Sequence, residues 1–517
     1  MTRRFLLGAA AFAAAARVLS VSAAIEVGSE LQFLWDDFVV DEAQTTAKAV
    51  QHVPRYVGCV HAIDHKWEGD CLDYAHIVRE PWGLRLYYKA YNSLCCEKRS
   101  PGKFCKRKYE APVCVIESRD GGLSWTTPDL GLIELCGSKH NNCVLDKSTD
   151  NFFVFKDPNP DCPKEELYKA LSGEGDFNER GEAVYGAVSL QCYASPDGIH
   201  FGTKPSWRVC KSGAFDTLNT VSWDAKKKEY VLYVRDYHGC RTPPDRNGEN
   251  SIRGVRVLRS KDFRSWTDPQ PIEFGPGAED YPLYTNGIHP YHRAPSVLIG
   301  FPARTVERQR WTPTFDRLCG AEMRKLRMQD GKTPREGLTL WDTIFCFSRD
   351  GLHFKRFDEA MFRPGPEHPD RNWVYGDTMT AVGEVETPGT YGTDPELSLF
   401  VVEGVKLGVP GKLNRYVIRL DGFVSRNAPY KGAKVVTKPI VFSGKELLLN
   451  FSTSARGFVY VTVKDDAGRS LKSWEIFGDK VDRVIDFRDG DLASFAGRPV
   501  TLEFDMSDAD IYSFRFR

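Results

Sequence analysis

A short motif recurs along this chain and constrains its fold more than any other feature. A serine is followed by Asp-Gly or a related turn and then, in most copies, by an aromatic residue. Four copies and a degenerate fifth start 65 to 88 residues apart, at Ser118, Ser195, Ser260, Ser348 and Arg419. Asp-Gly after a strand-like apolar run favours a tight turn between antiparallel strands. A repeat of this length indicates a structure built from similar multi-stranded units.

Each repeat contains further strand-like segments ahead of its motif. Five aromatic or aliphatic runs end in a charged residue, at Lys89, Lys156, Arg235, Arg304 and Glu403. Another segment lies upstream of each, around residues 74–78, 142–145, 219–223, 286–289 and 380–385. With the segment after the turn, each unit has four strands. The pattern predicts an all-β chain whose residues 25–436 form a five-bladed β-propeller, with the segment 31–40 closing the ring against the last blade.

The chain changes character after about Val436. Residues 437–517 contain no cysteine and several alternating strand-like segments, which predict a small C-terminal β-sandwich. Composition agrees with an all-β chain, because 31 Phe, 21 Tyr, 11 Trp, 44 Gly and 30 Pro favour strands and turns over helices.

The first 24 residues have the pattern of an export signal. Arg3-Arg4 precedes a short apolar stretch, and small residues follow up to Ala24. The start of the stretch is similar to a twin-arginine signal, and a general secretory signal is the alternative. We therefore expect a periplasmic or secreted protein whose mature chain starts near Ala24 or Ile25.

Charge and cysteine patterns limit the partners of the mature chain. Seventy basic residues balance seventy acidic ones, so the sequence lacks the basic excess of a nucleic-acid-binding protein. After signal removal no apolar run is long enough to span a membrane. No Cys-x-x-Cys pair or Cys/His spacing indicates zinc, so we expect no metal and no cofactor, with a structural calcium ion left open.

Polar residues gather at one predicted edge of the blades, where inner strands begin and second strands end. Such an edge surrounds the propeller axis, where propellers bind ligands. The residues that we single out there are Asp73, His140, Asn142, Asp216, Asn219, Arg235, Asp280, Asn286, Arg304 and Asp377.

Each of these groups also has a structural interpretation. The asparagines, poor strand residues, could cap strands or tie blades together instead of lining a pocket. The aspartates could begin Asx turns. The basic residues could form ion pairs with neighbouring aspartates instead of binding an anionic sugar.

The segment Phe215-Asp-Thr-Leu-Asn219, the strand Tyr230–Arg235 and the tail Arg498–Phe516 resemble exported bacterial glycoside hydrolases. A five-bladed propeller followed by a small β-sandwich is similar to glycoside hydrolase family 32 and to the family 43 clan. The chain lacks the Trp-Met-Asn-Asp-Pro-Asn-Gly signature and the Glu-Cys acid motif of the invertases. The resemblance therefore implies the architecture and a carbohydrate substrate, and does not assign the catalytic carboxylates.

Glycoside cleavage requires an acid for the leaving oxygen and a second carboxylate as nucleophile or base. We predict that this pair comes from Asp73, Asp216 and Asp280, and that His140, Asn142, Asn219, Arg235, Asn286, Arg304 and Asp377 bind substrate. Asp216, flanked by Arg235 and amide donors, suits the ionised role. The competing hypotheses are a carbohydrate-binding propeller without catalysis and a sialidase-like enzyme, the latter because Ser118–Trp125 matches a sialidase Asp-box.

Overall fold

A computed structural model describes residues 24–91, 111–146, 150–177, 183–211, 213–239, 252–330 and 334–517. Apart from Ala24, the predicted export signal lies outside these residues. The chain forms two compact units, one of residues up to Lys48 with Arg426–Arg517 and one of Ala49–Ser425. Of the helices in the described ranges, none is long and apolar enough to cross a membrane.

Five antiparallel sheets make up the second unit, which confirms the five-bladed propeller. From its innermost strand outward, blade 1 contains β5 (Cys71–Glu80), β6 (Gly83–Tyr91), β7 (Val113–Ser118) and β8 (Cys143–Leu145). In the same order, blade 2 contains β9 (Asp150–Lys156), β10 (Tyr168–Phe177), β11 (Ala183–Ser195) and β12 (Trp207–Cys210). Blade 3 contains β13 (Thr220–Asp224), β14 (Glu229–His238), β15 (Ile252–Ser260) and β16 (Gln270–Pro271).

The last two blades are less regular. Blade 4 contains β17 (His289–Tyr291), β18 (Ala294–Gly300) followed by β19 (Ala303–Glu307), β20 (Thr339–Ser348) and β21 (Phe354–Phe362). Blade 5 contains β22 (Met379–Thr380) with β23 (Val385–Thr387), β24 (Glu396–Glu403), β25 (Lys412–Arg419) and β4 (Arg55–Ala62). Short helices in this unit are η1 (Lys164–Glu166), α1 (Pro313–Arg317), α2 (Ala321–Asp330), α3 (Arg335–Leu338) and η2 (Thr390–Gly392).

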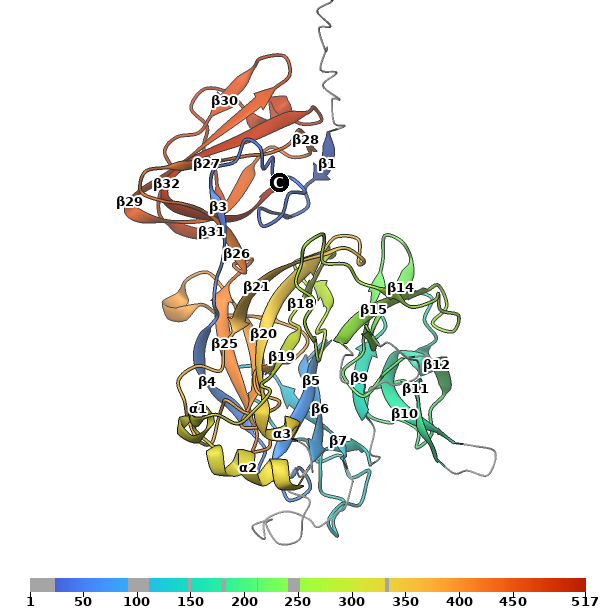
Figure 1. The fold of residues 1–517 in the computed structure, drawn as a ribbon. Coiled ribbons are helices and arrows are strands. Elements are labelled where there is room, and N and C mark those ends of the chain that lie inside the picture. Colours follow the sequence, from blue (N-terminus) through green and yellow to red (C-terminus); the bar gives the residue numbers. More distant parts are fainter. Residues whose placement is uncertain are drawn as a thin grey trace, which may run out of the picture. The chain divides into compact units, whose positions relative to one another are not determined.

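The ring is closed by β4, which pairs with β25 of the last blade. Figure 1 shows this blue strand beside the orange one. The prediction that residues 31–40 close the ring is wrong. That segment holds only the two-residue strand β2 (Gln32–Phe33), which pairs with the C-terminal strand β32 (Val500–Phe516). Its apolar side chains Leu34, Val39 and Val40 are buried in the core of the first unit.

The assignment of residues 142–145 to the start of blade 2 is also wrong. They form β8, the outermost strand of blade 1, and β9 begins blade 2. Blade 1 needs an outer strand after its Asp-Gly turn, and Cys143 supplies it by pairing with Cys114 of β7. Asn142 therefore precedes an outer strand and does not begin an inner one.

The four Ser-x-Asp motifs form one repeated turn at the opposite end of the blades from the inner-strand starts. In blade 4 the Asp350 carboxylate accepts hydrogen bonds from the backbone N–H groups of Leu352 and His353, both 2.8 Å long. The Ser348 hydroxyl accepts one from Gly351 N at 2.9 Å. Burial raises the pKa of Asp350, but hydrogen bonds from His353 and Leu352 outweigh it and lower the pKa to about 2. The motif is thus a locally satisfied turn.

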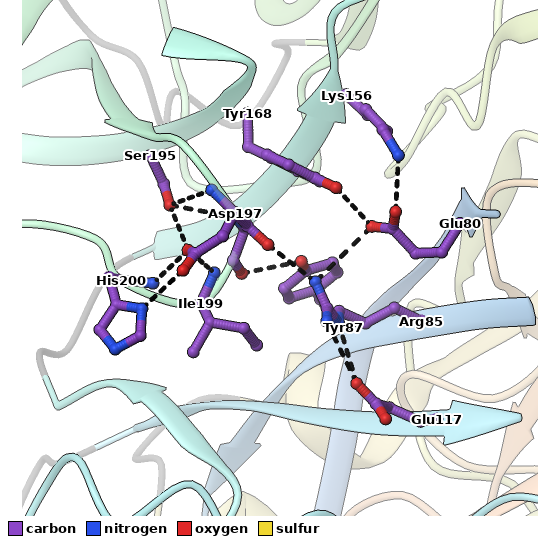
Figure 2. A network of polar contacts seen from close by, with 11 residues as sticks. Glu80, Arg85, Tyr87, Glu117, Lys156, Tyr168, Ser195, Asp197, Ile199 and His200 are labelled. Carbon is purple, nitrogen blue, oxygen red and sulfur yellow. Dashed lines mark hydrogen bonds and ion pairs between the residues drawn. The ribbon is translucent and has the colours of Figure 1, made fainter. Parts of the chain in front are cut away.

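These turns also receive hydrogen bonds from the preceding blade. Figure 2 shows Arg85 and Tyr87 of β6 donating to the carbonyls of Asp197 and Gly198 in the turn of blade 2, at 3.0 and 2.8 Å. Tyr233 of blade 3 donates in the same way to Gly351 O of blade 4, at 2.9 Å. The repeated motif therefore fastens neighbouring blades.

The first unit has its own core and one extensive sheet. The sheet strands are β1 (Ile25–Gly28), β2, β3 (Lys48–Gln51), β26 (Val424–Ala428), β27 (Ala433–Val436), β28 (Ile440–Phe442), β29 (Leu447–Asp465), β30 (Ser470–Lys472), β31 (Asp479–Val484) and β32. The short helix η3 (Leu492–Phe495) precedes β32. The long strands β29 and β32 pair along their length, so the strands form one hydrogen-bonded network. The predicted C-terminal β-sandwich is therefore not confirmed. The predicted ranges 25–436 and 437–517 also differ from the two units, because β1 pairs with β28 and β2 with β32.

Candidate functional site

Three tyrosines from different blades meet where the inner strands begin. Tyr74 lies on β5, whereas Tyr284 and Tyr375 precede the inner strands of blades 4 and 5. The Tyr284 hydroxyl interacts with those of the other two. The rings of Tyr284 and Tyr375 meet edge to face with centroids 6.2 Å apart. The ring centroid of Trp341, on β20, lies 4.4 Å from that of Tyr284.

The backbone of Tyr74 explains how this side chain reaches the cluster. Its φ is 56°, in the left-handed region, and the pairing of β5 with β6 is irregular between Asp73 and His76. A bulge of this kind redirects a side chain out of the regular alternation. Such strain persists only where surrounding structure holds it, and it is common at functional sites.

Four basic residues surround these tyrosines. Arg235 of β14 and Arg253 of β15 lie 5.6 and 4.7 Å from the centroid of the Tyr284 ring. Lys406 follows β24, and its ammonium nitrogen lies 4.2 Å from the centroid of the Tyr375 ring. Arg335 of α3 donates a 3.0 Å hydrogen bond to the Tyr375 hydroxyl. We refer to Tyr74, Tyr284, Tyr375, Arg235, Arg253, Arg335 and Lys406 as the tyrosine–cation cluster.

The charges of the cluster change the acidity of its phenols. Burial raises the pKa of Tyr284, but the positive charges of Arg235, Arg253 and Lys406 outweigh it and lower the pKa to about 8. Burial also raises the pKa of Tyr237, but the positive charges of Arg235 and Arg253 outweigh it and lower the pKa. Tyr74 has a raised pKa, because it is buried and faces Tyr284 and Asp73. The cluster thus carries a strongly positive local potential.

Asp73 is an enclosed carboxyl beside this cluster. It is 5% exposed, and its Oδ2 accepts a 2.6 Å hydrogen bond from the Tyr91 hydroxyl. Its Oδ1 is buried and has no hydrogen-bond partner among the described residues. Burial raises the pKa of Asp73, while Lys406 and Tyr91 oppose that shift. A carboxyl in this setting tends to hold its proton.

Asp216 has the opposite environment. Its side chain is 51% exposed and forms an ion pair with Arg235, which is 2% exposed. Arg235 also donates from Nε to Ala214 O at 2.9 Å, and its backbone N–H donates to Asn219 Oδ1 at 3.2 Å. The predicted grouping of Asp216, Asn219 and Arg235 is therefore present, and Arg235 connects it to Tyr284 and Tyr74.

Asp280 and Asp377 lie in other surroundings. The Asp280 carboxylate pairs with His238 Nε2 at 2.8 Å, and both line a cavity of about 330 Å³ beside β15. Asp377 is fully buried, with its carboxylate accepting 2.8 and 2.9 Å bonds from the backbone N–H groups of Trp373 and Thr378. Burial and the nearby Glu403 raise its pKa. It closes the turn that presents Tyr375.

The three asparagines make the contacts expected of structural ties. Asn219 donates to the carbonyls of Phe215 and Thr217, at 3.1 and 3.0 Å. Asn286 accepts from Thr220 Oγ1 at 2.9 Å and donates to Leu218 O at 3.2 Å, which joins blade 4 to blade 3. Asn142 donates to the Tyr88 hydroxyl at 3.1 Å within blade 1.

Two predicted binding residues also have protein partners. Arg304 binds Asp342 through two hydrogen bonds, of 2.9 and 2.7 Å. His140 is exposed and pairs with Asp129 at 2.7 Å. Substrate binding by these residues and by the asparagines remains a prediction.

One group among the described residues has spacing suited to a metal ion. Asp64, His65 and Glu68 place ligand atoms within 4.8 Å of one another. Glu68 already accepts hydrogen bonds from Tyr88 Oη and from His65 N. Two carboxylates and one imidazole do not select calcium over a transition metal.

A larger cavity of about 970 Å³ lies at the other end of the inner strands, near Arg79, Lys156 and Trp223. Its buried Glu384 accepts from His289 Nε2 and His292 Nδ1, both at 2.5 Å. The remaining ring nitrogens face Gly287 O and Glu386, so these four contacts occupy both imidazoles. These groups fasten blade 4 to blade 5 and are poorly placed for acid–base chemistry on a ligand.

Sequence reasoning missed Tyr74, Tyr284, Tyr375, Arg253 and Lys406. A signal existed for the tyrosines, since each lies within two residues of a predicted site residue, namely Asp73, Asn286 or Asp377. Arg253 and Lys406 gave no local signal, because only the closed ring brings them together.

Comparison with known proteins gives no family match. No family model and no curated protein matches the chain. Solved structures of similar fold include a family 32 β-fructofuranosidase of Bombyx mori, at 9% identity and TM-score 0.39, covering 92% of this chain and 96% of that one. A family 43 arabinoxylan arabinofuranohydrolase of Bacillus subtilis has 8% identity and TM-score 0.30, covering 86% and 78%. An N-acetylgalactosamine deacetylase of F. plautii has 12% identity and TM-score 0.41, covering 72% and 94%. At these values the matches assign neither a family nor an activity.

Proposed function

We propose that the protein is a glycoside hydrolase acting on an oligo- or polysaccharide at the starts of the inner strands. The observation that carries this is a pair of carboxylates in opposite environments. Asp73 is enclosed with a raised pKa, and Asp216 is exposed and ion-paired. Titratable groups whose environments separate their protonation states are typical of acid–base sites. Both adjoin the tyrosine–cation cluster.

In this proposal Asp73 supplies the proton. In its neutral form it transfers a proton to the leaving glycosidic oxygen. Tyr91 holds the other oxygen and fixes the carboxyl orientation.

Asp216 takes the second role as nucleophile or as base for water. Its ion pair with Arg235 favours the ionised carboxylate, and its exposed side chain can reach a ligand. Asp280, beside His238, is the reserve for this role.

A panel of plant and algal glycans tests the proposal. Release of reducing sugar from at least one glycan, lost in Asp216→Asn, is expected. No release from any glycan by the folded protein would count against it. A second candidate, a carbohydrate-binding propeller without catalysis, is favoured by the 5% exposure of Asp73. Glycan binding without turnover, equal in wild type and Asp216→Ala, would support that candidate.

We also propose that the protein is exported to the periplasm or secreted. Cys136 is disulfide-bonded, which suits an oxidising compartment. Mass spectrometry of the protein from its host's exported fraction should find a mature N-terminus near Ala24 or Ile25, and a chain retaining Arg3-Arg4 would contradict this.

A further inference from the structure

We propose that the tyrosine–cation cluster binds an anionic group, a carboxylate or sulfate carried by the sugar, through Arg253 and Lys406. This proposal names the substrate class of the site proposed above. It rests on the glycoside hydrolase function only in calling the ligand a substrate. Binding itself is independent of turnover.

The charge balance around the cluster supports an anionic ligand. Arg235 is neutralised by Asp216, and Arg327 of α2 by Glu336 of α3. In the described part of the chain, neither Arg253 nor Lys406 has a carboxylate within ion-pair distance. Arg253 faces the Tyr284 ring and donates to the Tyr237 hydroxyl at 3.3 Å, while Lys406 lies over Tyr375. Lys406 acts electrostatically on the carboxyls of Asp73 and Glu336, but Glu336 is shared with Arg327 and burial raises the pKa of Asp73. Among the described residues, positive charge around the cluster therefore exceeds negative charge.

Partial burial makes this excess of positive charge energetically unfavourable. Tyr284 and Tyr375 withdraw the two cations from part of the solvent, and a partly desolvated excess of positive charge is costly. Arg253 and Lys406 both retain partial exposure, whereas Arg235 is buried, so a ligand can reach the first two. An incoming anion would replace the lost hydration with ion pairs.

The conformations of the cluster are those of a preorganised site. Lys406 has φ 61° and Tyr74 has φ 56°, both in the left-handed region that side chains rarely adopt. Such backbone strain is maintained by surrounding structure and is concentrated at ligand sites. The lowered pKa of Tyr284 reports the same positive potential.

The side-chain chemistry matches a charged sugar. A guanidinium binds the two oxygens of a carboxylate or sulfate through parallel N–H donors, and an ammonium adds a point charge. Tyr284 keeps partial exposure and supplies aromatic surface beside these groups, which suits the apolar face of a sugar ring, while the buried Trp341 and Tyr375 pack behind it. Carboxylate and sulfate share this chemistry.

Calorimetric binding to matched ligand pairs tests the proposal. The pairs are oligogalacturonide with its methyl ester, and a sulfated oligosaccharide with its desulfated form. We expect at least one anionic member to bind about tenfold or more tightly than its neutral partner, less so at high salt. Arg253→Gln and Lys406→Met should each remove most of that preference, while Lys228→Met, an exposed lysine on the β13–β14 turn, should not. Equal binding within both pairs, or variants that keep the preference, would overturn the proposal.

A second measurement covers variants that fail to fold. Galacturonate or inorganic sulfate added to wild-type protein near pH 8 should reprotonate Tyr284, which lowers the ultraviolet absorbance of ionised tyrosine. Tyr284→Phe should lose this change. No absorbance change with either anion, or the same change in Tyr284→Phe, would contradict the subsite. Anion binding without hydrolysis of any glycan would leave this proposal intact and defeat the glycosidase proposal alone.

Discussion

The enclosed carboxyl of Asp73 allows a sharp test of the acid role. In Asp73→Asn the leaving group receives no proton, so hydrolysis of natural glycosidic bonds should fall by about 10²–10⁴-fold. Aryl glycosides with acidic phenol leaving groups need no such proton and should lose far less. The measurement is kcat/KM for both substrate types. An equal loss on both would show that Asp73 does not act as the acid.

Tyr284 gives the site a predictable pH dependence. Its pKa is about 8 in the folded chain against 10 for an ordinary tyrosine. Between these values the folded state has released a proton that the unfolded state keeps, so this group adds stability as pH rises. The stability of wild type relative to Tyr284→Phe should therefore increase from about pH 8 to about pH 10. Thermal melts of both proteins across that range measure it, and parallel curves would contradict the lowered pKa.

The site could be predicted from the sequence only in part. Asp216, Asn219 and Arg235 were predictable as neighbours, because Asp216 and Asn219 directly precede β13 and Arg235 lies on β14, which a short turn joins to β13. The roles of Asn219 and Asn286 were ambiguous, since their partners are carbonyls whose positions the pattern does not reveal. Arg253 meets Tyr284 and Lys406 meets Tyr375 only after five blades close into a ring.

At the scale of the element, the Ser-x-Asp turn predicts a stability effect without a catalytic one. Asp350→Ala removes the acceptor of two backbone N–H groups and should lower the free energy of unfolding by about 2 kcal/mol. The pKa of about 2 means that this stabilisation is lost as pH falls from about 4 towards 2. Chemical denaturation at neutral and acid pH measures it. The exposed turn residue Asp466, changed to Ala, is the control and should have little effect.

Activity of the Asp350→Ala variant separates the two ends of the blade. Because the turn follows β20 at the end opposite the inner-strand starts, kcat/KM should stay close to that of wild type. A large loss of kcat/KM in a folded variant would place the turn in the site.

Element assignment from sequence succeeded where hydrogen bonding is local. The Ser-x-Asp turns bond within six residues, so their residues reveal them. The closing strand β4 pairs with β25 more than 350 residues later, and no local pattern predicts that partner. The segment 31–40 has the apolar content of a closing strand, but its side chains pack in the other unit.

At the scale of the whole molecule, the propeller unit should fold alone. It has hydrophobic clusters of its own, and it includes the closing strand β4. A fragment of residues 49–425 should give a cooperative melt and a β-type circular dichroism spectrum. A fragment of residues 64–425 lacks β4, exposes the edge of β25 and should aggregate. Equal solubility and melting of the two fragments would contradict closure by β4.

The central claim, a hydrolase whose ionised carboxylate is Asp216, is tested most directly by kcat/KM of Asp216→Asn on a glycan that the wild type cleaves. The exchange keeps shape and leaves Arg235 Nε bonded to Ala214 O, so the fold should be retained. The melting temperature should fall, because the buried Arg235 guanidinium loses its charge partner. Asp224→Asn, at the end of β13, the strand that Asp216 precedes, is the matched control. The account predicts a loss of orders of magnitude in Asp216→Asn and none in the control. Full activity of Asp216→Asn would contradict it.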